Sequence, residues 1–412
     1  DRKSRLLQEV VVGKCVPKLL DKIGLKIDLL HMNEAHTVTA ACYIKEMKKY
    51  SSIPILFTTH TPVPAGMEIY PVEWFDLLEL PEKYLDLFRP KPSSNILDFT
   101  LAALKLSSLT NGVSLEHAEV TKNMFLEHRK KIIGITNGSS RYWQAPELRD
   151  PDSVTPEKLW DVHLKYKKEA LEDASNRLKN ILNEEIIFDI NKPSVGLFRR
   201  IVDYKQQYPM LCDIIEAVCA PLGEKVMTPM GELNGLGMQV FIAGYAHPTD
   251  AERQEWVSRF IKWTISENLR GRFAFLPGYG EVLLRHGARG YDIWINCPIK
   301  DMEACGTSDQ RSALNGNINI FTYTGGPREY IEEIDEDKAT GCGFVIDPYS
   351  PGTLYRKLEK ASQLWYSCIN GDSDTYKKIM FNSYKAGMTM TIENMALKYA
   401  RDLYLPALEM TE

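Results

Sequence analysis

Residues 194–205 have the sequence SVGLFRRIVDYK, which joins an apolar run to a cluster of positive charges. The first five residues predict a buried strand of a parallel sheet. A strand-to-helix turn is expected next, and it contains Arg200 and Lys205. Ligands of open parallel sheets bind beyond the carboxyl ends of the strands, so this turn is where a ligand is expected.

Arg200 and Lys205 have a spacing that lets two cations converge on one site across such a turn. A forked guanidinium and a point-like ammonium suit phosphate oxygens, and a helix N-terminus adds partial positive charge. Taken alone, the stretch is explained equally well as a solvated basic turn.

Short apolar runs alternate with helical patterns on both sides of this stretch, which is typical of an α/β protein with parallel sheets. Residues 150–191 are charged and predict helix. The further strands are expected at 27–31, 53–60, 131–136, 239–244, 272–276, 293–295 and 317–322.

Two such α/β blocks predict two Rossmann-like, doubly wound domains facing a cleft. We place the N-terminal domain at 1–190 and the C-terminal, ligand-binding domain at 191–385. By analogy with this fold class, a helix at 386–412 would cross back to the first domain. The first block is short and lacks a Gly-rich first turn, which favours a missing N-terminal portion. A second chain that supplies this portion, or a homo-oligomer, stays open as a partner.

The composition excludes several classes of protein. The chain has 412 residues, with 50 Lys+Arg against 55 Asp+Glu, which argues against a generally basic nucleic-acid binder. No apolar run approaches the roughly 18 residues of a membrane span. The eight cysteines form no CxxC pair and the histidines lack metal-ligand spacing, so we expect no metal. Reduced thiols and the absence of a signal peptide predict a cytoplasmic protein.

Two histidine-bearing turns follow neighbouring predicted strands of the first block. One is HMNEAH at 31–36, and the other is THTPVPAG at 59–66. A single histidine is more often structural than catalytic, but two such turns at one sheet edge favour a functional site. Asn137-Gly138 follows a third strand, where it is either a turn or part of this site.

A second polar motif lies at 302–316, MEACGTSDQRSALNG. Its loop enters a predicted helix that Ser308 would cap, and the N–H groups at this entry suit hydroxyl or phosphate oxygens. Glu303 would accept hydrogen bonds from sugar hydroxyls. An ordinary capped helix explains the same pattern. Gly325-Gly326 either permits close approach to a ligand or forms a strand-to-helix turn.

These motifs in this order resemble the α-glucan phosphorylases, particularly their short archaeal and bacterial form, which are retaining glycosyltransferases of the GT-B type. Residues 31–36 are similar to the family's H-L-N-E-G-H, and residues 57–66 to F-T-T-H-T-P-V-P-A-G. Residues 241–248 are similar to F-A-G-K-A-H-P, and residues 303–316 to E-A-S-G-T-S-G-M-K-A-A-L-N-G. The resemblance runs from about residue 5 to residue 316.

Two departures from the family pattern matter for the chemistry. The family lysine that bears pyridoxal phosphate aligns with Arg311, and the G-K-A lysine is Tyr245. A guanidinium stays protonated and does not form a Schiff base. We therefore expect no covalent pyridoxal phosphate, which argues against phosphorolysis by the family's mechanism.

Starch and glycogen synthases share the GT-B fold and need no pyridoxal phosphate. Their E-P-C-G-L-T loop is similar to residues 303–308, their T-G-G turn to 324–326, and their R-x4-K pair to Arg200 and Lys205. We therefore predict a glucosyltransferase that uses ADP- or UDP-glucose and an α-1,4-glucan. An α-glucan phosphorylase that uses a sugar phosphate and an inactive glucan-binding subunit are the alternatives.

The resemblance also implies roles for single residues. The implied catalytic groups are the backbone carbonyl at His60, which would face the anomeric carbon, and the side chains of Arg200, Lys205 and Glu303. Arg311 would occupy the anionic space that the cofactor fills in phosphorylases. The implied substrate-binding residues are Asn33, Glu34, His36, Asn137, Cys305, Gly306, Thr307, Arg311, Gly325 and Gly326.

Overall fold

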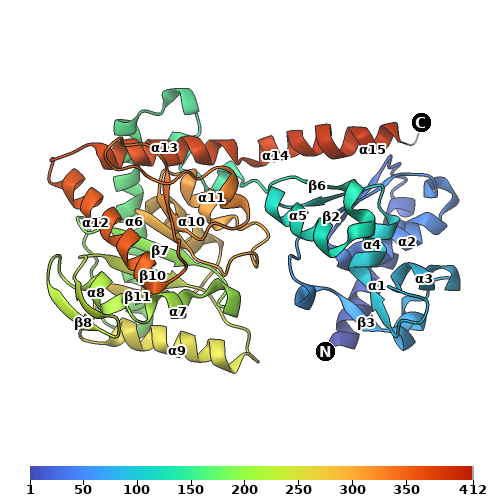
Figure 1. The fold of residues 1–412 in the computed structure, drawn as a ribbon, viewed down its shortest axis with the longest axis horizontal. Coiled ribbons are helices and arrows are strands. Elements are labelled where there is room, and N and C mark those ends of the chain that lie inside the picture. Colours follow the sequence, from blue (N-terminus) through green and yellow to red (C-terminus); the bar gives the residue numbers. More distant parts are fainter. Residues whose placement is uncertain (411–412) are drawn as a thin grey trace. The chain divides into compact units, whose positions relative to one another are not determined.

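The structure is a computed structural model, and it describes residues 1–410. It consists of two compact units, shown in Figure 1. The first contains Asp1–Asn137 and the C-terminal segment from Asn394, and the second is Gly138–Glu393. The sequence predicts a boundary at residue 190. The difference arises because α6 (Pro156–Leu182) packs against α10 and α13, which both belong to the second unit.

The first unit is built on a four-stranded parallel sheet whose order is β1-β2-β5-β6. The central strand β2 is buried along its whole length, as expected for a strand covered on both faces. The strands are β1 (Leu30–Asn33), β2 (Ile55–Thr59), β5 (Leu109–Gly112) and β6 (Ile132–Gly134), with a small antiparallel pair β3 (Ile69–Pro71) and β4 (Ile96–Asp98). The helices are α1 (Arg2–Lys22), α2 (Val38–Glu46), α3 (Leu85–Phe88), α4 (Phe99–Leu106) and α5 (Leu115–Met124).

The C-terminal segment packs on the sheet of the first unit. It comprises α14 (Ile392–Tyr399), a π-helical turn (Ala400–Tyr404) and α15 (Leu405–Glu409), which run beside β2 and β6 in Figure 1. Tyr399 and Leu403 pack with Leu56 of β2 in a small apolar cluster. The Asn111 amide nitrogen donates to the Tyr399 hydroxyl over 3.1 Å.

The second unit contains a six-stranded parallel sheet whose order is β11-β10-β7-β12-β13-β14. Counted along the chain, leaving out the β8–β9 hairpin, this is the doubly wound order 3-2-1-4-5-6. The strands are β7 (Ser194–Phe198), β8 (Lys225–Thr228), β9 (Gly231–Asn234), β10 (Gln239–Ala243), β11 (Phe273–Phe275), β12 (Ile293–Asn296), β13 (Ile318–Phe321) and β14 (Gly343–Val345). The helices besides α6 are α7 (Gln207–Leu211), α8 (Ile215–Cys219), α9 (Ala251–Ile265), α10 (Glu281–Gly290), α11 (Ser308–Ala313), α12 (Pro351–Ile369) and α13 (Thr375–Thr389).

A buried polar network joins α6 to the two central strands of this sheet. The Asp292 carboxylate, just before β12, lies 2.7 Å from the Lys167 ammonium and 2.7 Å from His163 Nε2. It also accepts hydrogen bonds from the backbone N–H and the hydroxyl of Ser194, each over 2.6 Å. Burial opposes ionisation of Asp292, but Lys167 and His163 bring its pKa below the usual value.

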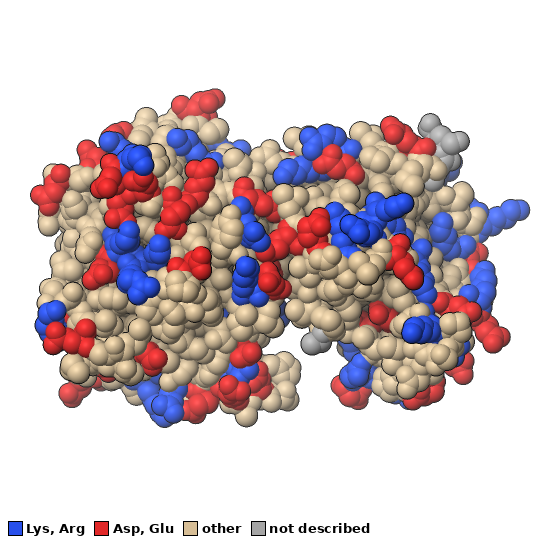
Figure 2. Space-filling model, viewed as in Figure 1, with Lys and Arg blue, Asp and Glu red and all other residues tan. Residues whose placement is uncertain are grey.

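The surface carries both signs of charge. On the face shown in Figure 2, basic and acidic side chains are interspersed on each unit. Among the described residues 1–410, none of the helices is both long and apolar enough to cross a lipid bilayer.

The Lys167–Asp292 pair predicts a large and specific loss of stability. Replacing Lys167 with Met leaves the Asp292 carboxylate buried without its main counter-charge, so the free energy of unfolding should fall by about 3–5 kcal/mol. The matched control is Lys168→Met on the same helix, whose 4.0 Å pair with Glu172 is exposed; it should cost less than about 0.5 kcal/mol. Urea unfolding followed by circular dichroism measures both, and equal losses would contradict the prediction.

Candidate functional site

The doubly wound order changes direction between β7 and β12, and polar residues gather at the carboxyl ends of these two strands. Lys205 follows β7, and Glu303 lies in the loop after β12. Their side chains form a buried ion pair. The Arg199 guanidinium adds a third group, with Nη2 3.5 Å from a Glu303 carboxylate oxygen. This cluster of Arg199, Lys205 and Glu303 is called the cationic cluster below.

The cationic cluster has more positive than negative charge. Burial opposes ionisation of Glu303, but Lys205 and Arg199 bring its pKa below the usual value. Desolvation, followed by the nearby Arg199 charge, lowers the pKa of Lys205 to about 8. Both side chains are therefore mainly charged at pH 7, and one carboxylate faces two cations.

Arg199, not Arg200, makes the direct contact with Glu303, and the sequence reasoning missed it. Arg199 is 6% exposed, and its Nε and Nη1 atoms have no hydrogen-bond partner among the described residues. Arg200 is exposed and acts on the cluster through its field, since it helps to lower the pKa values of Lys205 and Glu303. A buried guanidinium donor without a hydrogen-bond partner costs desolvation free energy, which an anionic ligand would offset.

Arg311, on α11, lies on an aromatic ring. Its guanidinium carbon is 4.1 Å from the centroid of the Trp143 ring. Burial lowers the pKa of Arg311, with Tyr279 and Asp309 acting in the opposite direction. Tyr279 also pairs edge-to-face with Tyr245, which follows β10, at 5.6 Å between ring centroids.

The N-cap of α11 is not the residue that the sequence predicts. Thr307, not Ser308, is the N-cap residue, and Ser308 is the first residue of a helix of only six residues. The Ser308 hydroxyl is buried and has no hydrogen-bond partner within residues 1–410. Cys305 is half-buried, and Gly306 lies near Arg199: a Cβ at Gly306 would be 3.7 Å from Nη2 of Arg199.

Asp309, which the sequence analysis did not select, is fully buried behind this loop. It accepts hydrogen bonds from the Asn296 amide over 3.1 Å and from the Tyr330 hydroxyl over 2.5 Å. Burial raises the pKa of Asp309 to about 6. These bonds connect α11, β12 and the segment after β13.

The Gly325-Gly326 turn approaches the same loop closely. Gly325 has φ +62°, and a Cβ there would lie 2.7 Å from the carbonyl oxygen of Glu303. Only glycine meets both conditions without strain. Gly326 begins the 3₁₀ turn that follows, so the two glycines bring the β13 turn against the Glu303 loop.

The first unit brings three of its predicted site residues together after β1 and β2. The Asn33 amide oxygen is 2.6 Å from Nε2 of His60. The Glu34 carboxylate accepts from the His60 backbone N–H over 2.7 Å and from the Thr61 hydroxyl over 3.0 Å. Glu34 holds φ +76°, an unusual backbone conformation for a residue other than glycine, and its carboxylate fixes the chain around His60.

The remaining predicted residues of this unit lie near the same turns. Burial lowers the pKa of His60, Glu34 opposes this, and the nearby His36 adds to it. The Asn137 backbone N–H donates to the Val113 carbonyl over 3.0 Å, which places Asn137 beside the β5 turn. His117, on α5, is buried and accepts from the Val113 N–H over 3.2 Å.

Comparison with known proteins identifies the fold. The catalytic domain of starch synthase IV from Arabidopsis thaliana, solved bound to ADP and acarbose, matches with a TM-score of 0.76 and 19% sequence identity. The match covers 98% of this chain and 78% of that one. This chain has the GT-B glycosyltransferase fold. The predicted fold class is therefore confirmed.

Sequence comparison points to the same enzymes and to the phosphorylases. Residues 5–132 match a family model described as the starch synthase catalytic domain. Glycogen phosphorylase of Aquifex aeolicus is 26% identical over 79% of this chain, and that of Mycobacterium tuberculosis (strain H37Rv) 28% over 88%. Glycogen synthase of Treponema denticola is 25% identical over 74% of this chain and 57% of its own length.

The chain spans about half the length of the curated phosphorylases that it matches, namely 54% and 49%. The predicted resemblance to GT-B glycosyltransferases of both the phosphorylase and the synthase kind is confirmed by these matches.

The charge balance of the cationic cluster predicts an anion-dependent stability. Glu303→Gln leaves Arg199 and Lys205 without a counter-charge, so unfolding should become easier by on the order of 1–3 kcal/mol. Millimolar pyrophosphate should restore the thermal midpoint, because it binds the folded state only. Asp301→Asn, at an exposed position in the same loop, is the control. Thermal denaturation measures this. A midpoint of Glu303→Gln that equals that of Asp301→Asn without pyrophosphate, or that pyrophosphate does not raise, would contradict the prediction.

Proposed function

We propose that this protein is a retaining glucosyltransferase that moves glucose from a nucleoside-diphosphate donor to the end of an α-glucan. The observation that carries the proposal is the cationic cluster at the switch point of the second sheet, whose buried guanidinium donors have no partner among residues 1–410. The similarity to starch and glycogen synthases supports it.

The cationic cluster would act on the leaving group. As the glycosidic bond breaks, negative charge develops on the diphosphate oxygens. Arg199 and Lys205 would stabilise that charge from preorganised positions, and Arg200 would add its field. Removing one such group typically costs on the order of 10²-fold or more in rate. Glu303 would hold a sugar hydroxyl and, through its ion pair, keep Lys205 in place.

The aromatic residues beside the cluster offer a surface for a base. Tyr279 interacts electrostatically with Arg199 and Arg311 and pairs with the exposed Tyr245. A planar, partly apolar base stacks favourably on such rings. A nucleotide donor therefore uses both parts of the site, whereas inorganic phosphate uses only the cations.

The first unit would supply the acceptor side and the backbone that faces the reacting carbon. By resemblance, the His60 carbonyl stabilises the oxocarbenium-like state. Glu34 and Asn33 hold the His60 backbone and side chain from two directions, so the orientation of this residue is fixed before a substrate binds. His36 and Asn137 would contact sugar hydroxyls.

Pyridoxal phosphate, which the phosphorylase resemblance implies, does not fit the residues present. Its covalent attachment needs a lysine amine, and Arg311 stands at that position with its guanidinium on the Trp143 ring. The proposed transfer therefore uses no pyridoxal phosphate.

The direct test is an assay of the purified protein with ADP-glucose or UDP-glucose and glycogen. We expect transfer of glucose from at least one donor, and loss of on the order of 10²-fold in kcat for Lys205→Ala. Lys192→Ala, at a half-buried position just before β7, is the control and should retain activity. Release of glucose 1-phosphate from glycogen and phosphate, with no transfer from either donor, would establish the phosphorylase alternative.

The cofactor proposal has its own test. Arg311→Lys restores the amine at the aligned position, and we expect it to bind pyridoxal phosphate, seen as near-ultraviolet absorbance that borohydride fixes to the protein. Arg311→Met lacks an amine and serves as the control. Fixation of the cofactor to the unchanged protein would contradict the proposal.

A further inference from the structure

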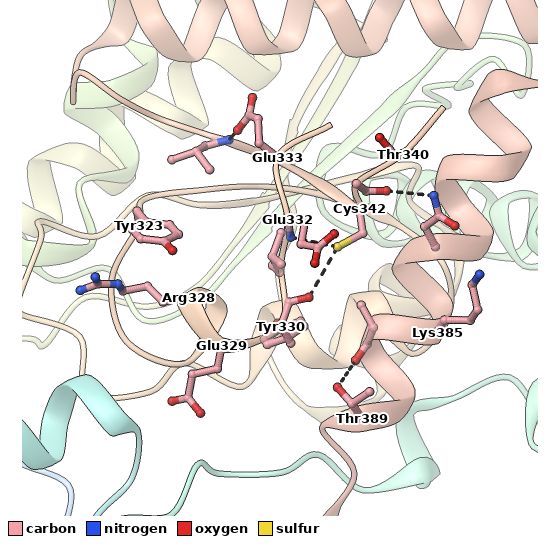
Figure 3. A pocket seen from close by; sticks show the side chains of 15 residues that line it. Tyr323, Arg328, Glu329, Tyr330, Glu332, Glu333, Thr340, Cys342, Lys385 and Thr389 are labelled. Atoms are coloured by element: carbon pink, nitrogen blue, oxygen red, sulfur yellow. Dashed lines mark hydrogen bonds between the residues drawn. The ribbon is translucent and has the colours of Figure 1, made fainter. Parts of the chain in front are cut away.

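A cavity of about 880 Å³ opens on the second unit, and no residue of the cationic cluster lines it. It lies between the segment after β13, the turn at 340–342 and helix α13, and Figure 3 shows the side chains that line it. The volume falls within the range of about 300–1,000 Å³ that is usual for ligand sites. The function proposed above makes no use of this cavity.

The walls of the cavity are held together before any ligand binds. The Asn382 amide nitrogen, on α13, donates to the carbonyls of Ala339 and Gly341 over 3.2 and 3.1 Å. The Cys342 thiol donates to the Tyr330 carbonyl over 3.6 Å, a bond drawn in Figure 3. A preformed cavity loses little conformational freedom when a ligand enters.

The lining favours a neutral polyhydroxy ligand. The lining carries two cations, Arg328 and Lys385, and three carboxylates, Glu329, Glu332 and Glu333, so a phosphorylated ligand meets no excess of positive charge. An apolar ligand would desolvate the Glu332 carboxylate at a high cost. Sugar hydroxyls both donate and accept, and they match a carboxylate, an ammonium, the Asn382 amide oxygen and the Thr340 hydroxyl.

An aromatic ring at the cavity fits the same ligand. Tyr323 is 42% exposed, and the Arg328 guanidinium lies 4.7 Å from its ring centroid. The C–H face of a sugar ring packs on such a surface while its hydroxyls bond at the edges.

The cavity is also connected to the donor site. Tyr330 lines it, and the hydroxyl of the same residue donates to Asp309 behind the loop of the cationic cluster. A polymer held here is kept at a high local concentration near the donor site.

We propose that this cavity is a second α-glucan binding site, which holds the polymer while another chain end is extended; the choice of glucan rests on the proposed function. The test is affinity electrophoresis in gels that contain glycogen. The double variant Glu332→Ala/Lys385→Ala should bind glycogen about fivefold more weakly, as expected for losing one or two hydrogen bonds. Lys378→Ala, on α13 but outside the cavity, is the matched control.

The outcomes separate this proposal from the function on which it rests. In the transfer assay, the double variant should raise the KM for glycogen by a similar factor and leave kcat and the rate with maltotriose unchanged. Equal glycogen affinity of the double variant and Lys378→Ala overturns the cavity proposal, even when the protein transfers glucose. If no donor supports transfer, affinity electrophoresis still tests the cavity. Maltoheptaose should then displace glycogen from the unchanged protein more than from the double variant. The proposal fails if glucose 6-phosphate shows this difference and maltoheptaose does not.

Discussion

The buried carboxylate of Asp292 is the constraint on which the second unit depends. It sits just before β12 and receives Lys167 and His163 from α6 and Ser194 from the start of β7. Replacing such a buried ionic network with apolar residues often leaves the free energy of unfolding unchanged. We therefore assign this network a role in positioning the elements that it joins. It fixes the two central strands and one helix in a single register, since any slip would leave a buried charge unpaired.

That register determines the positions of the side chains in the cationic cluster. With β7 and β12 held side by side at their beginnings, their carboxyl ends deliver Arg199 and Lys205 on one side and the Glu303 loop on the other. The mutual neutralisation of Lys205 and Glu303 lets both be buried. Among residues 1–410, the Nε and Nη1 atoms of Arg199 then have no hydrogen-bond partner, and they are the donors that the proposed function assigns to an anion.

Much of this was predictable from the sequence, and what was not has physical reasons. The apolar run at 194–198 gave β7 its observed bounds, because a strand buried on both faces leaves a continuous apolar signal. The boundary at residue 137 was not predictable, since the helical pattern of α6 does not reveal which sheet it covers. Ser308 was the expected N-cap, but Thr307 is the N-cap residue. Both are residue types that cap helices, so the sequence alone does not decide between two neighbouring positions.

The choice between Arg199 and Arg200 shows the same limit more sharply. The backbone of Arg199 continues the pairing of β7, its N–H donating to the Ala243 carbonyl, so its side chain shares a face with Val195 and Leu197. One position further, the side chain of Arg200 points to solvent. Strand periodicity predicts that Arg199 and Arg200 lie on opposite faces, but not which face lies toward Glu303. Tertiary packing decides that. A GT-B scaffold can therefore keep a familiar motif while a neighbouring residue makes the decisive contact.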